Sequence, residues 1–235
     1  MDKRSTAAQP DDLSTLPVIT AEEGAPLPGA LLQLSFITLS AGSILHRVHL
    51  SHYAANQFNP GVKGNARFSP IKTRHGQPIP TLYGGSTRDC ALMETVFHDV
   101  PFAPGLKTLD KNKLHYQLHS CLKVNEDMLL IDLSSIALRK LGITRKQLID
   151  TEKHHYPLTR RWAAALHHQS ESAQGLSWIS RQDDSARAVM LFGDRISPGM
   201  LTPLNKSLSL IDDSDTYGEV LHLASRLGVF IIAAK

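Results

Sequence analysis

The sequence predicts an α+β fold, a single mixed domain with a central β core and flanking helices. The 235 residues are enough for one domain with a sizeable core, whereas two domains would be crowded. Apolar or alternating runs of strand length recur between residues 44 and 232. Helical segments stand among them, as in Pro157–Ser170, where apolar side chains recur every four residues.

The first 43 residues are predicted to form an N-terminal arm, partly disordered or loosely docked. Prolines and glycines, which oppose regular structure, are dense between Pro10 and Gly29. We expect the folded domain to start between Leu31 and Ile44 and assign residues 44–235 to it. The chain shows no internal repeat and no low-complexity tract.

Periodicity places the secondary structure along the rest of the chain. Strands are expected at Ile44–Leu50, Asn65–Ser69, Thr81–Tyr83, Leu114–Val124, Met128–Asp132, Gly175–Ser180, Ala188–Phe192 and Val229–Ile232. Helices are expected from Ser86 to about His98, from Thr144, over Pro157–Ser170 and near Tyr217–Leu227. Ser86 and Asp89 resemble a capping box at the start of the first helix, and Gly228 is typical of the position after the last.

Composition argues against several classes of protein. The 25 basic and 22 acidic residues are spread evenly, whereas a dedicated nucleic-acid binder normally carries a basic stripe. The first thirty residues lack a signal peptide, and Leu31–Leu45 is too short and too polar to span a bilayer. We therefore expect a cytoplasmic protein with no direct nucleic-acid or membrane contact.

The sequence predicts no metal site. Cys90 and Cys121 show neither disulfide nor metal spacing, which suits a reducing compartment. His115 and His119 have i, i+4 spacing, but no third ligand accompanies them.

The segment Gly64–His98 and one downstream strand end hold the candidate functional residues. Arg67 follows Gly64, and Arg47 lies on a neighbouring predicted strand; arginine offers a bidentate fork for phosphate. Tyr83 ends a short apolar run, Glu94 lies in the next predicted helix among apolar residues, and Ser180 ends the strand LSWI.

These residue types suit the binding and cleavage of a dinucleotide such as NAD. Arginines hold a pyrophosphate, tyrosine stacks on a flat ring, and a carboxylate stabilises the oxocarbenium-like ribose formed when the glycosidic bond breaks. Each residue also has an ordinary structural explanation: a surface arginine, a core tyrosine, an ion-paired glutamate, a serine at a strand end.

In order and spacing these segments resemble the RES-domain family, named for an arginine, a glutamate and a serine. The resemblance rests on LHRVH, GNARF, LYGGS, ALMET, and WISRQ followed by VMLFGDR, from about Ile44 to Ile196. Phe68 stands where many members have tryptophan, and the chain is longer than compact members.

The resemblance implies a core similar to ADP-ribosyltransferase toxins and an enzyme that consumes NAD by hydrolysis or phosphorolysis, with no cofactor besides NAD as substrate. It implies a bacterial toxin whose antitoxin, a helix-turn-helix protein, covers the active site, so that oligomers arise through that complex. Arg47, Arg67 and Glu94 match the family arginines and glutamate, and Tyr83 and Ser180 match its tyrosine and serine. Ser180 is expected to contact the nicotinamide or its ribose.

The sequence alone leaves alternative functions open. A protein ADP-ribosyltransferase would use the same residues on a macromolecular acceptor. A non-catalytic NAD-binding or nucleic-acid-binding protein would bind without turnover. The sequence lacks the G-x-S-x-G, Walker and G-x-G-x-x-G motifs, so the common hydrolase, P-loop and Rossmann interpretations have no support.

Overall fold

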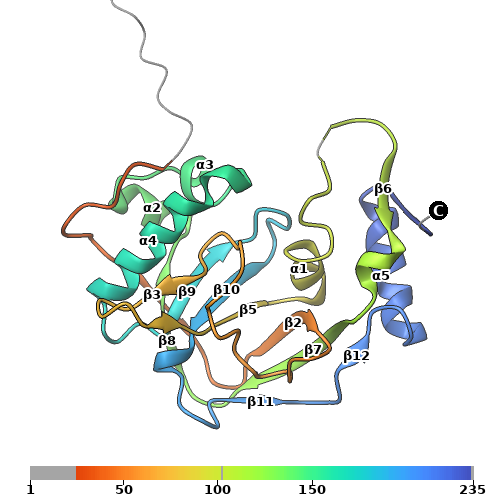
Figure 1. Cartoon of the computed structure of the whole chain (residues 1–235), viewed down its shortest axis with the longest axis horizontal. Coiled ribbons are helices and arrows are strands. Elements are labelled where there is room, and N and C mark those ends of the chain that lie inside the picture. The colour runs from red at the N-terminus through yellow and green to blue at the C-terminus, as the bar shows by residue number, and fades with distance from the viewer. Residues whose placement is uncertain (1–24, 102, 234–235) are drawn as a thin grey trace, which may run out of the picture.

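The computed structural model describes residues 25–101 and 103–233 (Figure 1). They form a mixed α+β domain on a nine-stranded sheet, which confirms the predicted fold class. The sheet order is β1-β8-β9-β10-β5-β2-β7-β11, with β12 also paired to β7; β8 and β9 are parallel and the other neighbours antiparallel. Its strands are β1 Phe36–Leu39, β2 Ile44–Leu50, β5 Thr81–Gly85, β7 Gln117–Val124, β8 Met128–Asp132, β9 Gly175–Ile179, β10 Arg187–Phe192, β11 Leu201–Pro203 and β12 Leu208–Ser209.

Smaller elements flank this sheet. β6 Lys107–Asp110 pairs in parallel with β13 Val229–Ile232, and β3 Ile71–Lys72 pairs with β4 Pro78–Ile79. The helices are α1 Arg88–Met93, α2 Ser135–Leu141, α3 Arg145–Leu148, α4 Tyr156–Gln169 and α5 Ser214–Arg226, with short 3-10 turns at Lys111–Leu114, Lys153–His155 and Gly193–Arg195. Helices α2 to α4 gather at one end of the sheet and α5 with β6 at the other (Figure 1). In the described part of the chain, no helix is long and apolar enough to cross a membrane.

The central strand β10 is buried on both faces. Met190 and Phe192 belong to the cluster that packs under Trp162 of α4, whereas Val189 and Leu191 belong to a second cluster. Such a strand reads as a continuous apolar run because both of its faces are covered. A third cluster joins α1, β6 and α5 and includes Leu92, Phe97, Leu109 and Leu223. The first two clusters therefore cover opposite faces of β10, and the third forms a separate core at the end of the domain that carries α5.

The predicted strand at Asn65–Ser69 is wrong; this segment is an irregular loop. The Ala66 amide bonds the Ser69 carbonyl locally, and the Phe68 amide bonds the Tyr83 hydroxyl instead of a neighbouring strand. Pro70, which has no amide hydrogen, follows at once. Gly64 has φ +135° with open space around it, so the loop needs glycine for its backbone conformation.

Helix α1 differs from its prediction at both ends. Thr87, not Ser86, is the N-cap, since its hydroxyl accepts the Cys90 amide. The helix ends at Met93, with Glu94 as C-cap, and not near His98. The amides of Thr95, Val96 and Phe97 all donate to the carbonyl of Leu92, so the regular helical hydrogen-bond pattern ends there.

The chain before β2 also contributes to the fold. Strand β1 pairs with β8, so the sheet begins at Phe36, in the part of the chain that the sequence assigns to the arm. The Trp162 indole donates to the carbonyl of Pro26, and Gln169 accepts the Leu32 amide. The rest of the predicted arm, residues 1–24, lies outside the described residues. Strand β7 starts at Gln117 and not at Leu114, because the preceding segment forms a 3-10 turn.

Candidate active site

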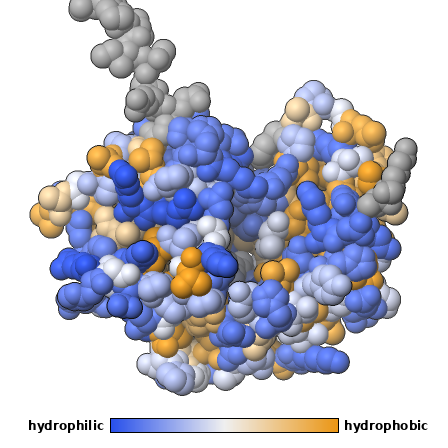
Figure 2. All heavy atoms as spheres, in the orientation of Figure 1, coloured by the Kyte–Doolittle hydropathy of each residue, from blue (hydrophilic) through white to orange (hydrophobic). Residues whose placement is uncertain are grey.

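A pocket of about 480 Å³ opens beside β2, β5 and α1. This volume falls within the range of small-molecule and cofactor sites. Four of the five expected residues line it: Arg47, Arg67, Tyr83 and Glu94. The molecular surface is hollowed between the end that carries α2 to α4 and the end that carries α5 (Figure 2).

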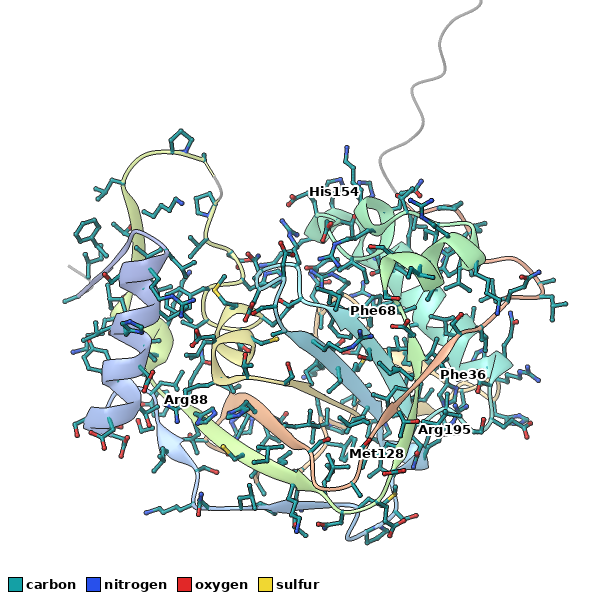
Figure 3. The ribbon with its side chains drawn as sticks, turned by 180° about the vertical axis from the view of Figure 1, so that it is seen from behind. Phe36, Phe68, Arg88, Met128, His154 and Arg195 are labelled. Carbon is teal, nitrogen blue, oxygen red and sulfur yellow. The ribbon has the colours of Figure 1, made fainter. Side chains whose placement is uncertain are left out.

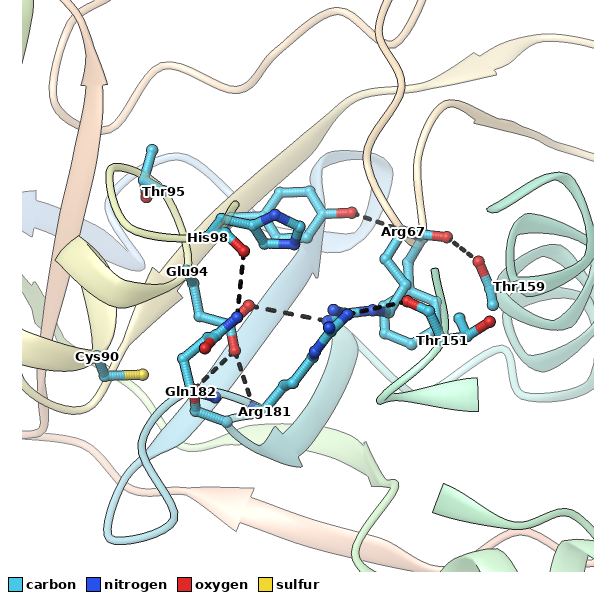
Figure 4. A network of polar contacts seen from close by, with 12 residues as sticks. Arg67, Cys90, Glu94, Thr95, His98, Thr151, Thr159, Arg181 and Gln182 are labelled. Atoms are coloured by element: carbon cyan, nitrogen blue, oxygen red, sulfur yellow. Dashed lines mark hydrogen bonds and ion pairs between the residues drawn. The ribbon is translucent and has the colours of Figure 1, made fainter. Parts of the chain in front are cut away.

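Glu94 lies at the C-terminal end of α1 with its side chain 16% exposed. Its Oε1 accepts hydrogen bonds from the Ser180 hydroxyl at 2.7 Å and from the Arg181 amide at 3.2 Å. Its Oε2 lies 3.8 Å from Nη1 of Arg67 (Figure 4). One carboxylate oxygen is therefore held by the chain, and the other faces a cation in the pocket.

Ser180 lies one residue beyond β9 and is fully buried. Its oxygen accepts the amides of Gln182 and Asp183 at 3.0 and 3.1 Å, while its proton goes to Glu94. Ser180 does not line the pocket, so the expected contact with nicotinamide or ribose has no geometric support. Its place is behind the carboxylate, which it orients.

Arg67 is 5% exposed, and its guanidinium has unused donors. Nε and Nη2 are buried without a hydrogen-bond partner, although buried polar groups are normally satisfied. The guanidinium lies 5.8 Å from the centre of the Tyr156 ring, and the Thr159 hydroxyl bonds the Arg67 carbonyl. A buried cation with free donors is costly unless an anionic or acceptor-rich group completes it.

Tyr83 fixes the loop that carries Arg67. Its hydroxyl accepts the Phe68 amide at 3.3 Å and donates to Ser69 Oγ at 3.2 Å. Burial raises the pKa of Tyr83 to about 12, so the hydroxyl keeps its proton at neutral pH. The ring packs edge-on against Trp178, 6.4 Å away between centroids, and also lines the pocket.

Arg47 enters the pocket from β2 and is 6% exposed. Its Nη1 donates to the carbonyls of Ala55 and Gln57 at 2.6 and 2.8 Å, which holds the loop after β2. Burial lowers the pKa of Arg47 to about 10, so it stays charged at neutral pH. The pocket wall thus carries three cations, Arg47, Arg67 and Lys153, and two carboxylates, Glu94 and Asp99.

The pocket wall also includes residues that the sequence did not predict. Tyr156 lies under Arg67, and its hydroxyl contacts His98 Nε2 at 3.2 Å. The other ring nitrogen of His98 contacts Asp99 at 2.9 Å, and Lys153 donates to that carboxylate, which holds the pKa of Asp99 below its ordinary value. No motif links these positions, because they meet only where α4 starts beside the turn after α1.

A model of the RES domain matches residues 44–206, more than half of the 235 residues. The chain belongs to the RES domain family. The expected resemblance is confirmed, and the matched region of this RES protein includes the pocket residues and Ser180.

The fold of this RES protein is similar to that of MbcT in the crystal structure of the M. tuberculosis MbcT-MbcA toxin-antitoxin complex. The TM-score is 0.55 at 16% identity, and the match covers 77% of this chain and 90% of that one. At this identity the likeness concerns the fold. No relative with a curated description matches the sequence.

Proposed function

We propose that this RES protein is an enzyme that cleaves the bond between nicotinamide and ribose in NAD. The observation that carries the proposal is the guanidinium of Arg67. It is buried, it has unpaired donors at Nε and Nη2, and it lies 3.8 Å from the Glu94 carboxylate in a pocket of cofactor size. A dinucleotide pyrophosphate supplies the acceptors that those donors lack.

Each pocket residue has a role in this proposal. Arg67 binds the pyrophosphate, helped by Arg47, and the Tyr83 ring packs on the nicotinamide side. Glu94 faces the ribose that carries the reacting carbon. Ser180 holds Glu94 in place through the hydrogen bond at 2.7 Å and does not contact NAD.

The proposed reaction breaks the C1′–N bond, and its electron pair stays on the ring nitrogen. Nicotinamide leaves as a neutral molecule and the positive charge passes to the ribosyl group. The Glu94 carboxylate stabilises that charge strongly, because it is mostly buried and already oriented. Water or phosphate then forms the new C1′–O bond; water loses a proton in this step.

Release of nicotinamide from NAD, followed with and without phosphate, tests the proposal and identifies the acceptor. Glu94→Gln keeps the size of the side chain and an oxygen for Ser180, so the fold should persist while turnover falls by about 10²–10³-fold. Glu126→Gln, in an exposed turn, is the matched control and should retain full activity. Equal turnover in wild type and Glu94→Gln would reject the assignment.

The acceptor decides between related activities. With labelled NAD and cell lysate, a labelled protein band would identify a protein ADP-ribosyltransferase. Label recovered as free ADP-ribose or ADP-ribose phosphate would identify hydrolysis or phosphorolysis. NAD binding without product would instead identify a non-catalytic binding protein.

We further propose a toxin in a toxin–antitoxin pair, with a helix-turn-helix antitoxin that covers the pocket. Support comes from family membership and from the fold shared with a chain of a toxin–antitoxin complex. Induced expression in bacteria should arrest growth and deplete NAD, and Glu94→Gln should do neither. Growth arrest that persists with Glu94→Gln would separate toxicity from NAD cleavage and contradict this proposal.

A further inference from the structure

Three side chains with metal-binding atoms, to which the proposed NAD cleavage assigns no role, meet beside the pocket. His46 comes from β2, and His119 and Cys121 come from β7. His46 lies directly opposite Cys121 in the strand register, and His119 is two residues away from Cys121 on the same strand. Side chains at these positions share one face of a sheet, so the antiparallel pairing itself brings the three together.

The spacing of the donor atoms suits one metal ion. His46 Nδ1 lies 3.1 Å from His119 Nε2 and 3.7 Å from Cys121 Sγ, and all the donor atoms of the group lie within 4.8 Å of one another. Zinc–nitrogen and zinc–sulfur bonds in a tetrahedral site place two nitrogens about 3.4 Å apart and a nitrogen and sulfur about 3.6 Å apart. The two separations measured from His46 Nδ1 lie close to those values.

Burial also favours the neutral form of each imidazole, which is the form that binds a metal. Burial lowers the pKa of His46 and lowers that of His119 to about 4, so both rings are neutral at pH 7 and keep a lone pair. Burial raises the pKa of the Cys121 thiol, while the positive Arg88 side chain opposes this. Arg88 begins α1, close to β2 (Figure 3), and pairs with Glu219 at 3.3 Å. A metal ion would bind the thiolate and release its proton.

We propose that His46, His119 and Cys121 bind a divalent transition-metal ion of the zinc type. Two imidazoles and a thiolate select such an ion over calcium or magnesium, which prefer oxygen ligands. Among the described residues, the group holds three His, Cys, Asp or Glu side chains, so the fourth position is left for water or an added ligand. His46 also lines the pocket, which places this position at or near its wall.

Cobalt(II) is the probe, because a thiolate–cobalt bond gives a charge-transfer absorption band and tetrahedral cobalt gives intense visible bands. Chelator-treated full-length protein should bind one equivalent with both signals, and zinc should displace the cobalt. Cys121→Ser should abolish the charge-transfer band and weaken binding at least about tenfold. Absence of the band in the wild type would overturn the proposal and leave His46 and His119 as a hydrogen-bonded pair.

Matched variants separate a lost ligand from a lost fold. His115 is exposed in the turn just before β7, so the His115→Gln variant should bind cobalt like the wild type. His46→Gln and His119→Gln should each weaken binding, with thermal unfolding recorded for every variant. Cys90 remains in Cys121→Ser, so a band that persists there would assign the thiolate to Cys90 and refute the site. None of these readouts depends on NAD turnover.

Discussion

The Ser180 hydroxyl donates a 2.7 Å hydrogen bond to Glu94, joining residues 86 positions apart. The same serine oxygen accepts the amides of Gln182 and Asp183, so a tight turn after β9 fixes where the hydroxyl proton points. The Arg181 amide adds a second donor to Glu94 Oε1. The orientation of one carboxylate thus depends on a turn from a distant part of the chain.

Replacing Ser180 by alanine should reduce kcat for nicotinamide release by about 10- to 100-fold, because a hydrogen bond to a charged group contributes about 1.5–3 kcal/mol. KM for NAD should change little, since Ser180 does not line the pocket. Two turn amides also lose their acceptor, so thermal unfolding should show a lower midpoint. Ser185→Ala, in the exposed part of the same loop, is the control. A rise in KM with unchanged kcat would instead assign Ser180 to NAD binding.

Arg67→Met should raise KM for NAD by about tenfold or more while leaving the free energy of unfolding unchanged or higher. The substitution keeps an apolar stem of similar length and removes a buried cation whose Nε and Nη2 have no partner. NAD titration and urea unfolding measure the two effects separately. A large loss of stability would show that Arg67 is mainly a structural ion-pair partner of Glu94.

The stability of the protein should decrease as the pH falls below 6.5, in part through His49. Its ring is buried, it contacts the Ser120 hydroxyl at 2.7 Å, and burial lowers its pKa from 6.5. Below pH 6.5 the unfolded chain therefore binds a proton that the folded protein does not, so the stabilisation present above 6.5 is lost as pH falls toward the folded pKa. Urea unfolding at pH 7 and pH 5 should show a smaller difference for His49→Gln than for the wild type. His154→Gln, at an exposed position, should behave like the wild type.

Thr87→Ala should destabilise the protein by about 0.5–2 kcal/mol, because Thr87 caps α1 by accepting the Cys90 amide. Ser86→Ala tests the neighbouring position, where the serine oxygen accepts the Arg187 amide and caps no helix. Since α1 carries Glu94 at its C-terminal end, Thr87→Ala should also lower turnover at elevated temperature. Far-ultraviolet circular dichroism during thermal unfolding checks both variants. Equal stability of Thr87→Ala and wild type would contradict the cap assignment.

Strands with a clear apolar period were predictable from sequence, as β2 and β8 show with the predicted bounds. The loop that carries Arg67 was not, because its backbone bonds go to the Tyr83 side chain. Alternation of apolar and polar residues indicates which side chains are buried and not which backbone they have. Phe68 is buried in a loop, so its segment resembles a strand in sequence.

Four of the candidate residues lie together in the structure, but their contacts could not be predicted from the sequence. Arg47, Arg67, Tyr83 and Glu94 do line one pocket. Ser180 contacts Glu94 because of the tight turn after β9, and the presence of a serine at this position does not predict that turn. The group of His46, His119 and Cys121 was missed because the two histidines lie on paired strands, 73 positions apart.

The bond between Glu94 and the turn after β9 has a consequence for biosynthesis. A ribosome makes Arg67, Tyr83 and Glu94 well before it reaches Ser180 and Arg181. Until that turn has left the exit tunnel, the carboxylate lacks both donors to Oε1. The proposed NAD cleavage, which relies on an oriented carboxylate, can therefore reach its full rate only after residues 180 and 181 have joined the fold.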